Sequence, residues 1–255
     1  SGLLLLAAAG LLLVMLLVKR LIREKAVLQS LGGGAQPSTF DHELAGGSLD
    51  GFRELLRSPY LLNQAAFMLL MTWVSTVAYF LQTDILASHL QGLEARTRAL
   101  ADIDLWVNIL SALILLFGLG RFVQRFGLTA GLVLNPLLMI GAFVAVLLSP
   151  SLLVIQAIQV VRRVGQYAIA RPSREMCFTV VEQVERYKAK NVIDTVVYRF
   201  GDVSAAWVQA GMRVLGSGLG GVVALGLATS ALWASVALSL GRRFGMLRRE
   251  ADRGG

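Results

Sequence analysis

Five long stretches without a charged side chain constrain this sequence more than any other feature. A helix needs about 20 apolar residues to cross a bilayer core, and these stretches approach or exceed that length. Of the 255 residues, 56% are hydrophobic and 16% are charged, unlike a soluble globular domain. The sequence therefore predicts an all-α polytopic membrane protein. The stretches are Ser1–Val18, Ser58–Thr83, Leu105–Gly120, Phe126–Val161 and Val214–Gly241.

The number of spans follows from these stretches and from one more polar segment. Phe126–Val161 is long enough for two helices and contains Ser-Pro-Ser at 149–151, which predicts a turn between antiparallel spans. A further span is predicted near 191–212, where ionisable residues stand among apolar ones. Seven spans result, with one sizeable loop over Asp84–Asp104. The seven predicted spans lie near residues 1–18, 59–82, 104–120, 127–148, 152–171, 191–212 and 217–240.

The lysines and arginines fall mainly on one side of these spans. Twenty of the 24 lie on the same side as the C-terminus, and only Arg96, Arg98 and Arg213 lie on the other. The positive-inside rule therefore predicts a cytoplasmic C-terminus. The same distribution accounts for the net charge of +8 through the flanks of helices, so no nucleic-acid partner is predicted.

A polar segment rich in glycine and serine follows the first span and predicts a flexible cytoplasmic linker. Its end, SLDGFRELLRSPY, predicts an amphipathic helix at the membrane surface or an ordinary lead into the next span. The first span begins at residue 1, without an initiator methionine, and its basic run follows it, unlike a signal peptide. We therefore expect a piece of a longer protein. The predicted divisions are a transmembrane helix at 1–25, the linker at 26–57, a six-helix bundle at 58–243 and a cytoplasmic tail at 244–255.

The residue types needed for catalysis or metal binding are sparse. Cys177 is the single cysteine, and His42 and His89 are far apart, so we predict no metal site and no cofactor. Asp194 and Asp202 are two helical turns apart, too far for a pair of carboxyls that share a proton. The sequence therefore favours a protein that is not an enzyme and has no catalytic residues.

The last predicted span argues against two further classes of protein. GSGLGG at 216–221 has the glycine spacing of a dinucleotide fold, but it opens an apolar span instead of following a strand. We expect close helix packing through Gly216 and Gly220 in its place. Leu215–Leu240 contains no lysine, which a seven-helix retinal protein requires for its Schiff base.

Two adjacent arginines lie where lipid is expected. Arg162 and Arg163 follow the predicted turn by about ten residues, which at about 1.5 Å per residue puts them near the middle of the bilayer. An arginine at that depth faces a water-filled cavity or an acidic partner. At about 100° per residue, Arg163, Tyr167 and Arg174 share one arc of the helix, with Arg171 nearby. The spacing predicts a basic stripe along a cavity.

The next span offers a second polar face. Asp194, Tyr198 and Asp202 recur at every fourth residue. For each residue alone, an ion pair that only joins helices is an equally good interpretation. Together, on two facing helices, the set favours a translocation path or an anion site. The predicted translocation residues are Arg162, Arg163, Gln166, Tyr167, Asp194, Tyr198, Arg199 and Asp202.

The segment between these two spans, PSREMCFTVVEQVERYKAK, is polar and rich in helix formers. We expect it to lie along the cytoplasmic surface, where its charges would gate the mouth of the cavity. For each residue alone, contact with water or with anionic headgroups is the simpler role. The predicted gate residues are Arg171, Arg174, Glu175, Lys188 and Lys190.

Several motifs resemble a known family. ARPSRE at 170–175 and YKAKNVIDTVVYRFGD at 187–202 are similar to the C-terminal half of bacterial relatives of the ATP/ADP translocases, which belong to the major facilitator superfamily. EARTRALADIDLWVN at 94–108 resembles the same group. GRFVQRFG at 120–127 resembles the short cytoplasmic loop of that superfamily, although Gln124 stands where an acidic residue is expected.

The resemblance implies that the seven spans are the sixth to twelfth helices of a twelve-helix transporter in the bacterial inner membrane. It implies secondary active transport by alternating access, with the bilayer and the missing N-terminal half as partners. The solute would be an anion, for which a nucleotide exchanged by antiport is one candidate, held by Arg162 and Arg163. The alternative is a non-nucleotide or lipid-handling member of the same fold that binds a phosphorylated headgroup.

Overall fold

The computed structural model describes Leu12, residues 15–20, Arg23 and residues 50–254. The chain divides into two compact units, Ser1–Gly46 and Gly47–Gly255, and each is considered by itself. In the first unit the described residues are helical. Most of the first predicted span, and the predicted linker up to residue 49, lie outside the described residues. The helices that carry the candidate site all belong to the second unit.

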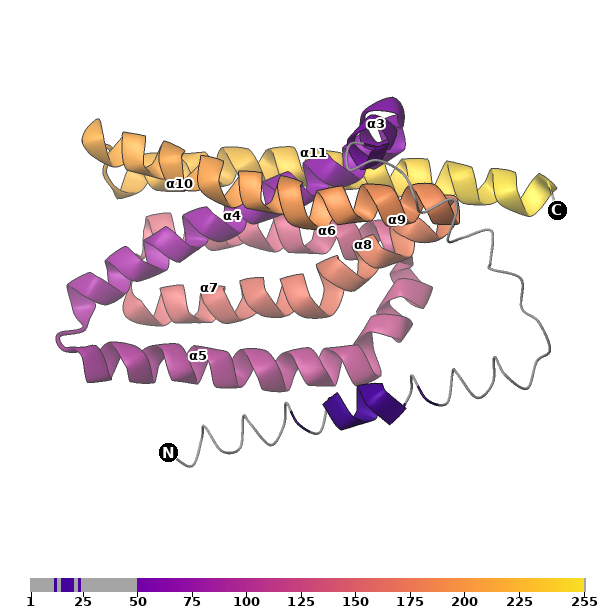
Figure 1. Cartoon of the computed structure of the whole chain (residues 1–255). Helices are drawn as coiled ribbons and strands as arrows, with labels where there is room; N and C mark the ends of the chain where they lie inside the picture. Colours follow the sequence, from indigo (N-terminus) through magenta and orange to yellow (C-terminus); the bar gives the residue numbers. More distant parts are fainter. Residues whose placement is uncertain (1–11, 13–14, 21–22, 24–49, 255) are drawn as a thin grey trace. The chain divides into compact units, whose positions relative to one another are not determined.

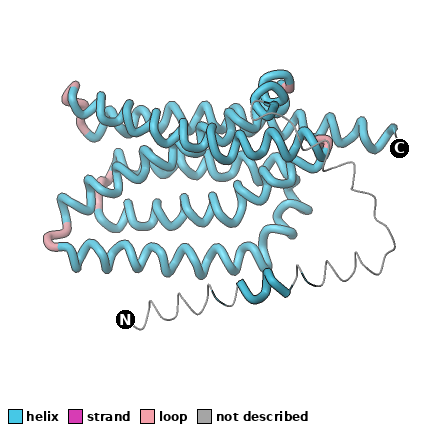
Figure 2. Tube along the Cα trace, in the orientation of Figure 1, coloured by secondary structure: helices cyan, strands magenta, loops and turns pink. Residues whose placement is uncertain are grey.

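Residues 50–254 form helices joined by short connections (Figures 1 and 2), and no strand occurs among them. Three of the helical segments are π-helical (η1, η2 and η4) and one is a 3-10 turn (η3). The elements are α3 (Asp50–Arg57), α4 (Pro59–His89), α5 (Leu93–Leu113), η1 (Ile114–Gly118), α6 (Leu119–Leu148), α7 (Leu152–Val164), η2 (Gly165–Ala170), α8 (Arg171–Cys177), η3 (Phe178–Val180), α9 (Gln183–Val192), η4 (Ile193–Val197), α10 (Tyr198–Val214) and α11 (Leu219–Gly254).

Three helical stretches in this unit are long and apolar enough to cross a membrane, namely Pro59–His89, Leu93–Leu148 and Leu219–Glu250. Two further rods, α7–η2–α8 and α9–η4–α10, are of comparable length but carry ionisable side chains. The prediction of an all-α polytopic membrane protein is confirmed.

Short polar signals set several helix boundaries. Ser58 caps α4, with its hydroxyl accepting a hydrogen bond from the Leu61 amide, and Pro59 supplies a preset φ at the first position. Ser151 caps α7 in the same way, so the predicted turn at 149–151 is confirmed.

One predicted connection is wrong, and the other, expected at 120–127, is a reversal at the last residue of that segment. The predicted loop over Asp84–Asp104 is wrong, because α4 continues to His89 and α5 begins at Leu93. The charged residues at the start of α5 are good helix formers on an exposed face, and only three residues are needed to reverse the chain. The long stretch Leu93–Leu148 reverses at Gly127, whose φ of 81° is readily adopted by glycine.

The connections gather at two ends of the bundle (Figure 1). One end, called the hairpin end, holds the turns at 90–92, 149–151 and 215–218. The opposite end, called the basic end, holds Gly127, the 181–182 connection and the C-terminal part of α11. Most of the described arginines outside the spans lie at the basic end, as the alternating topology requires.

The bundle is centred on α4 and α11, which pack along each other, while α6 covers α11 and α10 covers α4. The Phe67 and Trp233 rings meet edge to face at 5.5 Å in this core. Small residues let α6 and α11 approach closely, since an added Cβ at Gly226 would lie 2.5 Å from the Phe143 ring.

The glycine pair expected from sequence does not make this contact. Gly216 lies in the turn before α11 with φ 69°, and a Cβ at Gly220 would meet nothing within 4 Å. The expected packing through Gly216 and Gly220 is therefore wrong. The spacing of glycines in a sequence shows which of them could allow close helix packing, but not which face of the helix meets a neighbour. The rotation of α11 places Gly226 and Gly241, and not Gly220, against α6.

We expect Gly226→Ala to destabilise the bundle by about 1–3 kcal/mol, because the buried Phe143 ring has little room to move. Gly220→Ala is the matched control, and should be neutral or slightly stabilising since alanine favours helix. Cys177, the single cysteine, is fully buried, so its reaction with a maleimide dye during heating reports unfolding. Equal midpoints for both variants would contradict the assigned α6–α11 contact.

Candidate functional site

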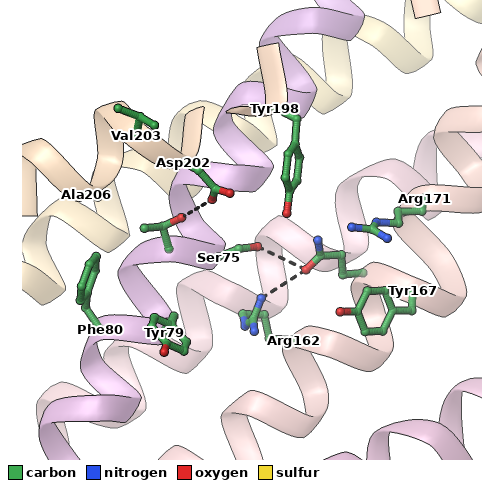
Figure 3. Close-up of a pocket in the computed structure, with 12 residues that line it drawn as sticks. Ser75, Tyr79, Phe80, Arg162, Tyr167, Arg171, Tyr198, Asp202, Val203 and Ala206 are labelled. Atoms are coloured by element: carbon green, nitrogen blue, oxygen red, sulfur yellow. Dashed lines mark hydrogen bonds between the residues drawn. The ribbon is translucent and has the colours of Figure 1, made fainter. Parts of the chain in front are cut away.

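A cavity of about 500 Å³ opens between α4, the α7–η2–α8 rod and α10 (Figure 3). Arg162 lies ten residues into α7 and Asp202 twelve residues before the end of α10, about 15 and 18 Å from the hairpin end. The cavity therefore lies about half the thickness of a bilayer core of about 30 Å from the hairpin end. Its lining residues are Ser75, Thr76, Tyr79, Phe80, Arg162, Gln166, Tyr167, Arg171, Tyr198, Asp202, Val203 and Ala206.

Arg162 is the central charged group of this cavity. Its Nε donates to Gln159 Oε1 at 2.9 Å and its Nη1 donates to Gln166 Oε1 at 3.2 Å. Gln159 is itself fixed by donating to the Ala78 carbonyl at 2.7 Å. No carboxylate of the described residues lies within 4 Å of Arg162. The guanidinium is thus held in place by neutral groups, and no carboxylate of the described residues offsets its charge.

The wall formed by α4 and α10 has the opposite character. Thr76 Oγ1 donates to Asp202 Oδ1 at 3.0 Å, and Ser75 Oγ donates to Gln166 Oε1 at 3.2 Å. Within the described chain, Asp202 has no basic side chain at salt-bridge distance. One wall of the cavity therefore offers guanidinium donors, and the other offers a carboxylate and hydroxyls.

Aromatic rings complete the lining. The Arg171 guanidinium lies 5.0 Å from the centre of the Tyr167 ring, which is a cation–π contact. Both side chains line the cavity. Tyr79, Phe80 and Tyr198 come from α4 and α10 (Figure 3). Planar rings next to cations can bind a solute that combines an anionic group with a flat ring.

Two π-helical segments position these side chains. Gln166 and Tyr167 lie in η2, and Tyr198 directly follows η4. A π-helical turn holds an extra residue, so it rotates everything beyond it relative to an ordinary helix. The arc predicted at 100° per residue is therefore not formed, and Arg162, rather than Arg163, shares the cavity with Tyr167.

Five of the eight predicted translocation residues line the cavity, together with Arg171 from the predicted gate. The other three lie elsewhere. Arg163 forms an ion pair with Asp104 of α5, Asp194 pairs with Arg174 at 2.7 Å, and Arg199 is exposed. The five that line the cavity are Arg162, Gln166, Tyr167, Tyr198 and Asp202.

The contribution of α4 was missed from sequence. Ser75, Thr76, Tyr79 and Phe80 line the cavity, yet they stand in a charge-free stretch that was read only as a span. The available signal was the helical spacing of Ser75 or Thr76 with Tyr79, which places hydroxyls on one face of an apolar helix.

A second cavity of about 390 Å³ shares Arg171 and Tyr198 with the first and extends toward the basic end. It contains a cluster of ion pairs around Arg174, whose exposed fraction is only 4%. Arg174 Nη2 lies 2.9 Å from Glu175 Oε1, and Lys190 Nζ lies 2.5 Å from Glu175 Oε2. The cluster joins the connecting helices α8 and α9 to η4 through Asp194.

Glu175 is ionised throughout the physiological range. Burial opposes its charge, but the hydrogen bond from Lys190 and the nearby Arg174 outweigh burial and lower the pKa of Glu175 below its usual 4.5. A lowered carboxyl pKa stabilises the fold above the unfolded value, and this contribution is lost only as the pH falls through the folded value. The ion pairs of Glu175 therefore do not change between pH 6 and 8.

The predicted gate residues fall partly into this cluster. Arg174, Glu175 and Lys190 form it, and Arg171 lies between the two cavities. Lys188 is half-buried on α9. In the described part of the chain, no three His, Cys, Asp or Glu side chains gather as a metal site would require.

The comparisons with known proteins agree with the part of the resemblance that concerns the ATP/ADP translocases. The chain is similar to ADP,ATP carrier protein 1 of Chlamydia trachomatis, at 24% identity over 220 residues, and of Chlamydia pneumoniae, at 25% over 191 residues. These matches cover 76% and 67% of this chain but only 42% and 37% of the carriers. The chain thus spans about two fifths of the length of these curated relatives. No protein-family model and no solved structure matches it.

We expect Asp194→Asn to lower the stability of the bundle by on the order of 2 kcal/mol. Breaking a buried pair costs about 3–5 kcal/mol, but Arg174 keeps Glu175 as a second partner. The control is Asp84→Asn, which breaks the pair with Arg213 at the hairpin end, also 2.7 Å long but half exposed, and should cost less than about 1 kcal/mol. Thermal labelling of Cys177 measures both. A larger loss for Asp84→Asn would show that the Arg174 cluster is not a structural centre.

Proposed function

We propose that this chain is part of a secondary active transporter that moves an anionic solute through the mid-depth cavity. The observation that carries the proposal is Arg162, a guanidinium at mid-depth without a carboxylate partner in the described chain. An unpaired arginine costs about 2.5–3.5 kcal/mol at the centre of a membrane helix, so its retention favours a bound anion as the missing partner.

A nucleotide is the solute we favour. Arg162 and Arg171 supply forked donors for phosphate oxygens, and the rings of Tyr79 and Tyr167 supply surfaces on which a base can stack. Asp202 is placed to accept hydrogen bonds from hydroxyl groups. The similarity to proteins named ADP,ATP carriers supports the same class of solute.

We further propose alternating access of the major facilitator kind, with antiport of nucleotides. The cavity has walls from α4, α7–η2–α8 and α10, and a second six-helix bundle would close its open side. The neighbouring cavity around Arg174 provides a polar path toward the basic end, and opening of the Arg174–Asp194 pair would gate it. By the positive-inside rule this end, with the C-terminus, faces the cytoplasm of a bacterial inner membrane.

The first experiment is uptake of labelled ATP into proteoliposomes that contain the full-length protein, either preloaded with ADP or empty. Uptake that depends on preloading supports nucleotide antiport. If nucleotides do not move while a fluorescent phospholipid crosses between leaflets, the alternative of a lipid-handling protein with a headgroup in the cavity is correct.

In this assay Arg162→Gln should lower uptake by about tenfold or more, because a hydrogen bond to a charged group contributes about 1.5–3 kcal/mol. Arg162→Lys should recover part of the activity, since it restores charge without the planar fork. The matched control is the double variant Arg163→Gln/Asp104→Asn. It removes both charges of the ion pair next to Arg162, so neither partner is left with an unpaired charge. It should retain uptake within about threefold, and an equal loss in control and Arg162→Gln would refute the assigned cavity.

A further inference from the structure

A third cavity, separate from the two described above, lies at the basic end between α6, η3 and α11. Its volume is about 450 Å³, within the range of about 300–1,000 Å³ found for sites that hold small molecules. Its lining is mainly apolar, with Arg248 as the single charged side chain. The lining residues are Val123, Leu128, Met176, Thr179, Val180, Phe244 and Arg248.

Six arginines, in the segments 121–125 of α6 and 242–249 of α11, lie at this end of the bundle, and all six are exposed. Among the described residues, none of them has a carboxylate within 4 Å. Neither segment contains an acidic residue, and Glu250 and Asp252 follow the second one in the sequence. The six are Arg121, Arg125, Arg242, Arg243, Arg248 and Arg249.

The basic residues of the neighbouring Arg174 cluster behave differently. There Arg174 and Lys190 are matched by Glu175 and Asp194 at 2.5–2.9 Å. The chain therefore supplies carboxylates to one set of cations at the basic end and leaves the other set without them. The excess positive charge beside the third cavity favours the binding of an anionic partner from outside the described chain.

The depth of the cavity identifies the kind of partner. The apolar run of α11 from Leu219 to Leu240 is about 33 Å long, close to the thickness of the hydrocarbon core. Phe244 then lies about 6 Å beyond this run and Arg248 about 12 Å beyond it. The apolar lining thus meets the edge of the acyl chains, and Arg248 lies at the level of the headgroups.

We infer that the cleft between α6, η3 and α11 is a binding site for one anionic phospholipid. The upper part of an acyl chain packs against Val180 and Phe244, and the phosphate is held by Arg248 with the neighbouring arginines. The guanidinium of Arg125 lies 5.8 Å from the centre of the Phe126 ring, and this cation–π contact holds the charge of Arg125 near the surface of α6. This site requires only the membrane setting and does not depend on which solute the protein moves.

The test is native mass spectrometry of the purified full-length protein with phosphatidylglycerol or with phosphatidylcholine of the same acyl chains. We expect one phosphatidylglycerol to be retained more strongly than phosphatidylcholine. Arg248→Gln should weaken its binding by about fivefold, the factor for one basic residue near an anionic surface. Val180→Trp, which fills the cavity, should weaken binding of the same lipid by a similar factor.

Arg57→Gln is the matched control, since Arg57 is exposed at the start of the same unit and does not line the cleft. It should leave binding within about twofold of the starting protein. Protection of Cys177 from maleimide verifies that each variant is folded, and Val180→Phe replaces Val180→Trp if the latter is not. Equal retention of both lipids, equal losses in Arg57→Gln and Arg248→Gln, or full displacement by inorganic phosphate would each overturn the proposal.

Discussion

An arginine within a membrane-spanning bundle has to be shielded from lipid, and the contacts that Arg162 makes with its neighbours meet this requirement. Gln159 and Gln166 hold the guanidinium, and Gln159 is fixed in turn to the backbone of α4 at Ala78. These contacts turn the charge inward, toward α4 and α10. Because both amides are neutral, they orient Arg162 without cancelling its charge, which leaves a cavity able to attract an anion.

The helical architecture was largely predictable, because each span has to satisfy its own backbone hydrogen bonds and therefore appears as an apolar stretch. Ser151 and the preceding Ser-Pro marked one reversal correctly. The Asp84–Asp104 region was misread, since charged residues at a helix start look like a loop when only hydropathy is considered. The contact between Gly226 and Phe143 could not be foreseen, because it depends on the rotation of α11 against α6.

The candidate site was predictable in kind but not in detail. Charge within a span correctly pointed to the rods that carry Arg162 and Asp202. Which of two adjacent arginines shares the cavity with Tyr167 depends on the π-helical segment η2, whose extra residue does not show in the helical periodicity of the sequence. The wall from α4 was missed because hydroxyl groups such as those of Ser75 and Thr76 do not interrupt a hydrophobic stretch.

Within a membrane, paired and unpaired charges have different consequences. Arg163 with Asp104, and Arg174 with Asp194, are pairs whose charges cancel, so they join helices and need no ligand. Arg162 and the arginines around Arg248 have no such partner in the described chain. A cation at mid-depth can be matched only by something that enters the cavity, whereas a cation at the headgroup level can be matched by the bilayer itself. On the two proposals made above, depth separates a site for a moving solute from a site for a resident lipid, although both are built from arginine.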